Sequence, residues 1–325
     1  MKAFNAVMRM LTVCILMAIA GSSAAQQDYP NKPIRFITPY VPGGTTTILA
    51  RLIGQKLTES WGQQVLVENR PGGNTAIGTE AVAKSAADGY TILLAASTHT
   101  LLPQLQSVPY DPFKDFAAVA TLAKTEIVLV LNASVPANNL QEFIAVAKSR
   151  PGKLNYATPG AGGVLHLATE MFNIMAGTKM QHIPYKGAGQ GLVDLIAGQV
   201  QLYFVTSAAI VPHSKNPKLR AIAVTGDTRL PALPEVPTFA EAGLPGFDMR
   251  TWFGVLAPAG TPKAIIGRLS TEMAKHLAAP DFKEKLLSQG LEPFYTAPDQ
   301  LAILMKADMA TFAKVIKTAN IKMEN

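Results

Sequence analysis

Short apolar segments recur five times in the first two thirds of the chain, each followed by a glycine or polar turn and then by residues with helical spacing. This alternation is typical of β-α-β units built around parallel sheets. The apolar segments do not alternate cleanly with polar residues, as expected for strands covered by helices on both faces. The sequence therefore predicts an α/β fold. The five expected strands are IRFITPYV (34–41), QQVLVENR (63–70), YTILLAAS (90–97), KLNYATPG (153–160) and MQHIPYKG (180–187).

The last third of the chain departs from this pattern. A proline-rich passage at 227–247 is followed by an apolar strand at 251–260 and then by three helical stretches. The first of these helices is expected to contain Pro262 just inside its start, with Thr261 as its cap.

Two apolar strands, 126–134 and 251–260, are each followed by a turn and a new helix. A pair of this kind suits two crossings between two lobes. We therefore expect a first lobe made of 26–125 and 251–325, with 126–250 inserted as the second lobe.

The first 25 residues have the pattern of a secretory signal peptide. Lys2 and Arg9 give a positive start, the apolar run MLTVCILMAIA is short for a membrane span, and small residues precede a cleavage position after Ala25. The alternative is an N-terminal membrane anchor. Cys14, the one cysteine of the chain, would leave with the signal peptide, so the exported protein would contain no disulfide, thiolate nucleophile or cysteine metal site.

Charge and histidine content exclude two classes of protein. The net charge of +7 comes from scattered basic residues that do not interleave with aromatic ones, so no nucleic-acid surface is predicted. The five histidines show no metal-ligand spacing, so no metal and no cofactor are expected. Without an exposed heptad or a strongly apolar surface helix, we expect a monomer.

Glycine turns carry the candidate binding site. A helix that begins directly after glycine presents unpaired backbone N–H groups and a partial positive charge, which suit a carboxylate. Glycine turns also join strands to helices for purely structural reasons. The first candidate loop contains Tyr40, Gly43, Gly44, Thr45, Thr46 and Thr47, and the second contains Pro159, Gly160, Ala161, Gly162, Gly163 and His166.

Ser97, Thr98 and His99 are further candidates, because they lie just after the apolar run TILLAA, where a loop of the first lobe should meet the ligand. Val205 and Thr206 in QLYFVTSAA become candidates only through the resemblance given below. His166 is expected either to reach a carboxylate or to act as a half-buried or capping histidine of its own helix.

The chain resembles the Bug-type solute-binding proteins of tripartite tricarboxylate transporters. The matching stretches run through nearly the whole chain after the signal peptide. Among them are YPNKPIRFITPYVPGG, VENRPGG, DGYTILLA, YDPFKDFAAVA, HIPYKG, LPEVPTFAEAGLPGF and WFGVLAPAGTP. The resemblance implies a type II periplasmic-binding-protein fold, with two lobes that are joined by two crossing strands and close on an organic acid. It also implies a periplasmic location and, as partners, a large and a small membrane permease subunit driven by an ion gradient.

Two departures from the family pattern bear on the ligand. Many relatives carry an acidic residue where Thr47 stands, and Asp followed by Asn or Ser where this chain has Val205 and Thr206. Such an acid would receive a ligand ammonium or hydroxyl group. Its absence predicts a dicarboxylate or an aromatic carboxylate without a cationic group, whose body lies against Tyr40, Val205 and His99.

Three other readings remain at this point. An enzyme is disfavoured because no G-x-S-x-G, no nucleotide-binding loop and no cysteine nucleophile is present. A receptor that signals to a membrane sensor kinase would have the same fold and site. The effector domain of a transcriptional regulator would carry a DNA-binding helix pair where this chain has an export signal.

Overall fold

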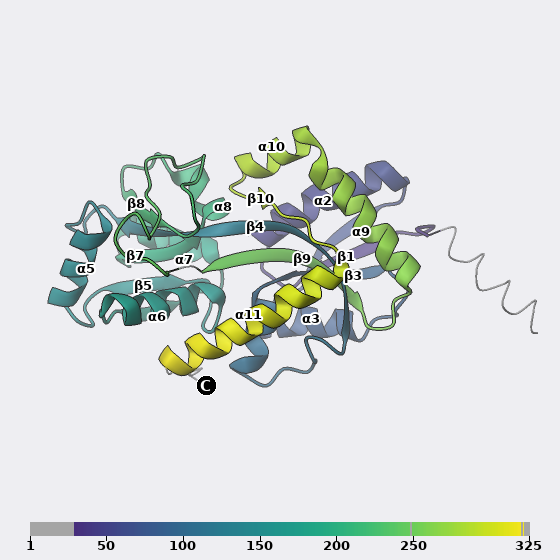
Figure 1. Ribbon diagram of the computed structural model, residues 1–325, viewed down its shortest axis with the longest axis horizontal. Helices are drawn as coiled ribbons and strands as arrows, with labels where there is room; N and C mark the ends of the chain where they lie inside the picture. The colour runs from purple at the N-terminus through teal and green to yellow at the C-terminus, as the bar shows by residue number, and fades with distance from the viewer. Residues whose placement is uncertain (1–28, 248, 320, 322–325) are drawn as a thin grey trace, which may run out of the picture.

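A computed structural model describes residues 29–247, 249–319 and 321 (Figure 1). The signal peptide expected at 1–25 lies outside these residues. In the described part of the chain the strands are β1 Ile34–Thr38, β2 Val65–Asn69, β3 Thr91–Ala96, β4 Phe116–Asn132, β5 Asn155–Thr158, β6 Gln181–Pro184, β7 Leu202–Thr206, β8 Leu219–Val224, β9 Arg250–Pro258 and β10 Glu292–Pro293.

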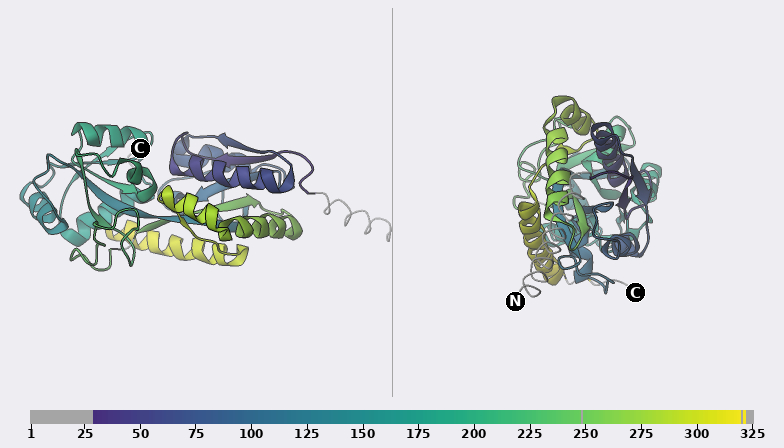
Figure 2. Two further views of the ribbon diagram at one scale, coloured as in Figure 1. Left: turned by 90° about the horizontal axis from the view of Figure 1, so that it is seen from above. Right: turned by 90° about the vertical axis from the view of Figure 1, so that its right-hand side faces the viewer.

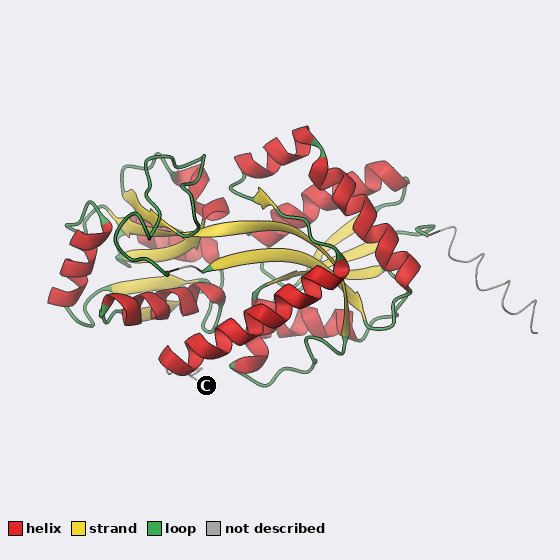
Figure 3. Cartoon of the chain, in the orientation of Figure 1, coloured by secondary structure: helices red, strands yellow, loops and turns green. Residues whose placement is uncertain are grey.

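Helices lie on both sides of these strands (Figure 3). In the described ranges no helix combines the length and the hydropathy needed to cross a membrane. The helices are α2 Thr45–Trp61, α3 Ala76–Ala83, α4 Thr98–Leu101, α5 Leu140–Ser149, α6 Val164–Ala176, α7 Ala188–Ala197, α8 Ser207–Ile210, α9 Lys263–Ala278, α10 Pro280–Ser288 and α11 Pro298–Ala319, with short 3-10 turns η1 Gly73–Thr75, η2 Leu102–Gln104 and η3 Val211–His213.

The strands form a sheet in the order β2-β1-β3-β9-β4-β7-β5-β6, and β8 and β10 also pair with β4. Strands β1, β2 and β3 are parallel to one another, as are β5, β6 and β7. Between the two parallel groups, β9 and β4 run antiparallel to their neighbours. The predicted α/β fold, with all five expected strands, is confirmed.

Strand β4 is longer than expected from the sequence. It begins at Phe116, whereas the apolar pattern indicated a start near 126. Its first part is rich in alanine, and it is held in the sheet by pairing with β9 from Phe116 to Glu126. The second part, from Ile127, pairs with β7. The two parallel groups are therefore joined through this one strand.

The apolar cores divide in the same way. One cluster is drawn mainly from residues between Ile127 and Met249, whereas two other clusters are drawn, apart from Ala208, from the remaining parts of the chain. This distribution supports the boundaries 26–125, 126–250 and 251–325, which we propose as those of two lobes. We call them the first lobe, made of the two outer segments, and the second lobe, made of the inserted segment.

Helix α11 spans both lobes. Leu301 and Met305 pack into a core of the first lobe, and Phe312, two to three turns later, packs into the core of the second. Figure 2 shows this helix running beneath both halves of the molecule. The C-terminal helix therefore contributes to the apolar cores of both lobes.

The predicted cap of α9 is wrong. The helix begins at Lys263 with Pro262 as its N-cap residue, and no side chain caps it. The Thr261 hydroxyl instead donates to the Pro258 carbonyl, 2.7 Å away. The hydroxyl is thus already engaged in the turn that follows β9.

A prediction concerns Phe172 in α6, which is fully buried among other phenylalanine rings. Its ring centroid lies 5.4 Å from that of Phe204 and 6.1 Å from that of Phe247. We expect Phe172→Ala to lower the free energy of unfolding by about 3–5 kcal/mol, through lost burial and the cavity left behind. Val193→Ala on α7, where 63% of the side chain is exposed, is the control and should change it by less than about 0.5 kcal/mol. Urea denaturation measures both, and similar losses would contradict the assignment of Phe172 to the core.

A second prediction concerns the contact between β9 and α11, where the Trp252 indole N–H donates to the Asp308 carboxylate. Burial raises the pKa of Asp308 from 3.8 to about 6, although the Trp252 hydrogen bond opposes the shift. The folded protein therefore binds this proton more tightly than the unfolded chain. The associated stability is fully present below pH 4 and is lost as the pH rises through 6.

Asp308→Asn, which is uncharged at every pH, should therefore be more stable than the wild type at pH 7.5, by about 1–2 kcal/mol. The difference should disappear near pH 4, where Asp308 of the wild type is protonated. Thermal unfolding followed by circular dichroism tests this. A difference that does not change between the two pH values would contradict it.

Candidate functional site

The first glycine loop connects β1 to α2. Gly44 is the N-cap of the helix with extended backbone angles, and Gly43 before it has a φ of 88°, which favours glycine. The N–H groups of Thr45 and Thr46 donate to no acceptor among the described residues, whereas that of Thr47 donates to the Gly44 carbonyl. The start of α2 therefore offers unpaired donors, as the sequence predicted.

The threonine hydroxyls of this loop have different surroundings. Thr45 Oγ1 lies 3.5 Å from Thr206 Oγ1 at the end of β7. Thr47 is buried, and its hydroxyl oxygen accepts a 2.7 Å hydrogen bond from Asn69 Nδ2. Asn69 also donates to the backbone carbonyl of Tyr40. Thr45 thus faces the other lobe, while Thr47 is held inside its own.

Tyr40 and Thr98, two residues predicted from separate loops, lie together. Burial raises the pKa of Tyr40 to about 12, and a hydrogen bond with the Thr98 side chain opposes the shift. The Tyr40 hydroxyl therefore remains protonated at neutral pH. Thr46 is also buried, so its contribution to this loop is its backbone N–H group.

The second glycine loop, 159–163, connects β5 to α6. Gly163 is the N-cap of α6 with extended backbone angles like those of Gly44, and the N–H groups of Gly163 and Val164 donate to no acceptor in the described part of the chain. The Gly162 N–H is different, because it donates to Nδ1 of His166 at 3.0 Å. His166 thus fixes the loop before its own helix, and contact between His166 and a carboxylate remains a prediction.

Two stacked histidines contact residues in and next to this loop. The rings of His166 and His182 stack with centroids 4.0 Å apart, and His182 also stacks on Tyr156. Nε2 of His182 lies 2.6 Å from the hydroxyl of Thr158, which itself donates to the Gly160 carbonyl. Burial, helped by the nearby His166, lowers the pKa of His182 to about 3. His182 is therefore neutral at physiological pH.

The two glycine loops lie on facing edges of the lobes. Thr45 approaches Thr206, as described above, and Asn74 Nδ2 donates to the Ala161 carbonyl at 3.0 Å. A Cβ atom at Gly187 would lie 2.8 Å from the Val41 side chain, so these loops also touch. Every one of these loops follows the carboxyl end of a strand, where open α/β sheets bind ligands.

Three further predicted residues lie in the protein interior. Ser97 Oγ is fully buried and accepts hydrogen bonds from Thr251 Oγ1 and the Trp252 N–H. His99 is buried beside Tyr110, and burial lowers its pKa to about 4 although a hydrogen bond with the Pro112 carbonyl opposes this.

Val205, the third, has no exposed surface and pairs with Val128 in the sheet. A ligand could contact it only after a change in packing. Pro159 and Gly160, in contrast, lie in the loop that faces the first lobe, and contact with a ligand remains a prediction for every residue of both loops.

Sequence reasoning missed two asparagines. Asn69 connects the end of β2 to the first glycine loop, and Asn74 connects the next turn to the second lobe. Asn74 stands directly after Gly72 and Gly73, so the signal available was an amide side chain at a glycine turn. That signal does not reveal the partner, which is 87 residues away in the chain.

The electrostatic character of the loops comes from backbone groups. No acidic residue occupies the first turn of α2, α6 or α7, so nothing there competes with an anion for the positive end of these helices. In the described ranges no group of His, Cys, Asp and Glu residues could hold a metal ion.

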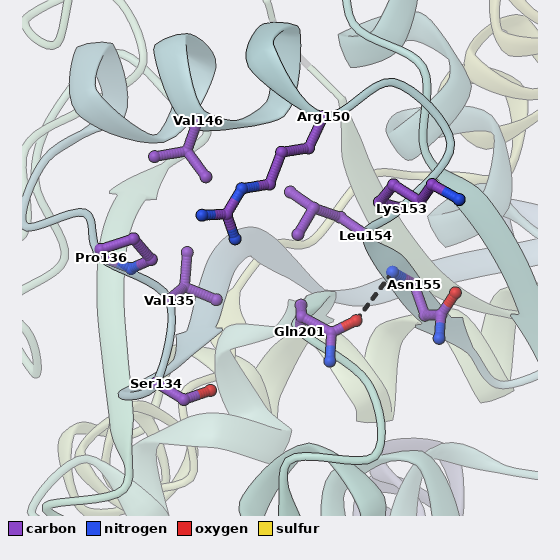
Figure 4. Close-up of a pocket in the computed structure, with 9 residues that line it drawn as sticks. All are labelled: Ser134, Val135, Pro136, Val146, Arg150, Lys153, Leu154, Asn155 and Gln201. Atoms are coloured by element: carbon purple, nitrogen blue, oxygen red, sulfur yellow. Dashed lines mark hydrogen bonds between the residues drawn. The ribbon is translucent and has the colours of Figure 1, made fainter.

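A separate cavity of about 360 Å³ lies in the second lobe (Figure 4). It is found where β4 ends and β5 and β7 begin, which is the edge opposite to the glycine loops. Arg150 points into it, and Gln201 accepts a hydrogen bond from the Asn155 N–H at its floor. None of the predicted site residues lines this cavity.

Comparison with known proteins gives a consistent result. The model of the tripartite tricarboxylate transporter family receptor, TctC, matches residues 49–321. BugT of Bordetella pertussis is 37% identical over 97% of this chain and 99% of its own length.

Solved structures agree with these sequence matches. An R. palustris protein with adipate has a TM-score of 0.87 at 36% identity, covering 90% of this chain and 99% of that one. MatC from Rhodopseudomonas palustris with bound malate has a TM-score of 0.82 at 29% identity, covering 89% of this chain and all of that one. The matched family is described as a transporter receptor and not as an enzyme. The chain belongs to the receptor family of the tripartite tricarboxylate transporters.

Proposed function

We propose that this protein is a periplasmic receptor that captures an organic carboxylate between its two lobes and delivers it to a tripartite tricarboxylate transporter permease. The observation that carries the proposal is that the loops before α2 and α6 both lie where the two lobes meet, since Thr45 approaches Thr206 and Asn74 donates to Ala161. Each helix begins after a glycine and has unpaired backbone N–H groups. Relatives with adipate and malate support a carboxylate ligand.

Capture follows from this geometry. One carboxylate group of the ligand accepts hydrogen bonds from Thr45 and Thr46 in the first lobe, and a second accepts them from Gly163 and Val164 in the second lobe. Each charge-assisted hydrogen bond contributes about 1.5–3 kcal/mol. An acid that bridges both loops therefore binds the closed arrangement more tightly than the open one, and this difference shifts the population toward closure.

The ligand class follows from the side chains near these loops. An ammonium group on the ligand would need a carboxylate partner, and the first turns of α2, α6 and α7 contain no acidic residue. The family resemblance implies an acidic residue where this chain has Thr47, and Asp followed by Asn or Ser where it has Val205 and Thr206. We therefore propose a dicarboxylate or an aromatic carboxylate without a cationic group.

The partners and the location follow from family membership. The large and small permease subunits of the transporter would accept the closed, loaded receptor, and residues 1–25 would direct export to the periplasm before removal. A receptor for a membrane sensor kinase would use the same site. Acid uptake by cells that lack this receptor but retain the permease subunits separates these two roles.

A panel of acids tests the ligand class. We expect adipate, malate and aromatic carboxylates to include a ligand that binds with a dissociation constant near the micromolar range, equivalent to about 8 kcal/mol. Aspartate and glutamate should bind much more weakly, because their ammonium groups find no acidic partner. Isothermal titration calorimetry measures the affinities. Exclusive binding of an amino acid would refute the proposed class.

Two glycine substitutions test the site itself. Gly44 and Gly163 both have ordinary backbone angles, and a Cβ atom at either position would meet nothing in the protein closer than 4.0 Å. Gly44→Ala and Gly163→Ala should therefore fold normally while placing a methyl group at the mouth of each loop. We expect each to weaken binding of the best acid about 10- to 100-fold, the equivalent of one or more charge-assisted hydrogen bonds.

Gly267→Ala is the matched control, because position 267 lies in α9 and has equally open surroundings. It should bind the acid like the wild type and be slightly more stable, since alanine favours helices over glycine. Unchanged affinity in both Gly44→Ala and Gly163→Ala, with intact folding, would exclude these helix starts as the ligand site.

A further inference from the structure

Asn74 has an unusual backbone conformation. It lies in the turn after β2 with φ 52° and ψ 44°, and Thr75 beside it also has a positive φ, of 88°. Positive φ values are uncommon outside glycine; asparagine tolerates them best, and a β-branched residue such as threonine rarely adopts them. Two such residues in succession indicate that the surrounding structure holds this turn in place.

The side chain of Asn74 crosses from the first lobe to the second. Its Nδ2 donates to the Ala161 carbonyl at 3.0 Å. Its Oδ1 lies beside Gly160, where an added Cβ atom would approach it to 3.2 Å. The left-handed turn thus directs an amide side chain onto the backbone of the opposite glycine loop.

The peptide group that Asn74 contacts is also held from its own lobe. The carbonyl of Ala161 accepts from Asn74, while the N–H of the same peptide, which belongs to Gly162, donates to His166 Nδ1 at 3.0 Å. Both polar groups of this peptide are therefore engaged. Only one of the two partners, His166, stays with the loop when the lobes separate.

Asn74 differs from the other contacts between these loops. The Thr45 and Thr206 hydroxyl oxygens are 3.5 Å apart, at the limit of a hydrogen bond, and the contact between Val41 and Gly187 is apolar. The Asn74 bond is shorter, and it ends on the backbone of the loop proposed to bind the ligand. The Asn74 side chain thus links the first lobe directly to the backbone of the loop 159–163.

We propose that Asn74 is a positioning residue that latches the closed lobes and fixes the Ala161–Gly162 peptide. On closure the Asn74 amide donates a hydrogen bond to the Ala161 carbonyl. This bond holds the loop 159–163 in an orientation that directs the Gly163 and Val164 N–H groups toward the bound acid. Asn74 acts through the loop and does not touch the ligand. This inference rests on the proposed function, because the acid is the ligand that the latch retains.

Three substitutions separate the side chain from the backbone turn. Asn74→Ala removes the amide. Asn74→Gly also removes the amide, but glycine adopts the left-handed conformation without steric cost. This variant therefore decides the result if the alanine variant fails to fold. Asn74→Asp keeps the size but has no donor at neutral pH. Gln55→Ala, which removes an exposed amide that donates to Glu59 on the same helix, α2, is the control.

Closure is measured through the distance between nitroxide labels on Leu66→Cys and Val193→Cys, in a chain with Cys14→Ser, both with and without adipate. Stopped-flow release of adipate gives the dissociation rate. We expect Asn74→Ala and Asn74→Gly to lower the closed-to-open ratio and raise the dissociation rate about 3- to 10-fold, the effect of one hydrogen bond to a neutral backbone group. Asn74→Asp should do at least as much, and Gln55→Ala should change neither quantity.

Each outcome decides the question. Wild-type values of the closed-to-open ratio in Asn74→Gly overturn the latch, as does a wild-type protein whose labels show only the separated state. If adipate fails to bind but another acid of the panel does, that acid replaces it as the probe. If no acid binds, the proposed function fails, and the label distances in the absence of ligand still test whether Asn74 holds the lobes together.

Discussion

The pairing of β4 with strands of both lobes is the interaction on which the rest of this structure depends. Its first part forms a ladder with β9, and its second part forms ladders with β7 and β8. Because one hydrogen-bonded strand belongs to both halves of the sheet, the carboxyl ends of the two parallel groups are brought to face each other. The point of change lies near Glu126, which pairs in register with Arg250 of β9.

Side-chain contacts also connect distant segments at this crossing. The Thr125 and Ser207 hydroxyls are 2.7 Å apart and share a proton between them, and their oxygens lie 3.1 and 2.8 Å from the Gly290 carbonyl, which accepts from the other hydroxyl proton. Gly290 lies so close to Ala208 that a Cβ atom would be within 2.7 Å of its backbone nitrogen. Three segments distant in the sequence are thus joined at the crossing, while the glycine loops on the facing edges of the lobes are joined by the few contacts described above. Such a distribution favours motion of the loops about a fixed hinge.

In the proposed site, backbone N–H groups rather than cationic side chains would hold the anion, so its chemistry depends on position. A backbone N–H group donates only in the direction set by the chain, so the starts of α2 and α6 must be aimed at the ligand. Asn69 holds the first loop by bonding both Tyr40 and Thr47, and His166 holds the second through the Gly162 N–H. These polar side chains therefore hold the two loops in place, and the helix ends supply a partial positive charge.

The sequence by itself determined the α/β class, the strands that precede each glycine turn, and the two helix starts at Gly44 and Gly163, because these depend on local spacing and on residues without a Cβ atom. The roles of Ser97, His99 and Val205 could not be read in the same way. In the sequence, a residue at the end of a strand has the same pattern whether its side chain faces the gap between the lobes or the core. Only the pairing of β3, β4, β7 and β9 decides which way the side chain faces. Tertiary structure alone also brought Asn74 to Ala161, since that contact requires the two lobes to meet, and no local pattern encodes a partner 87 residues away.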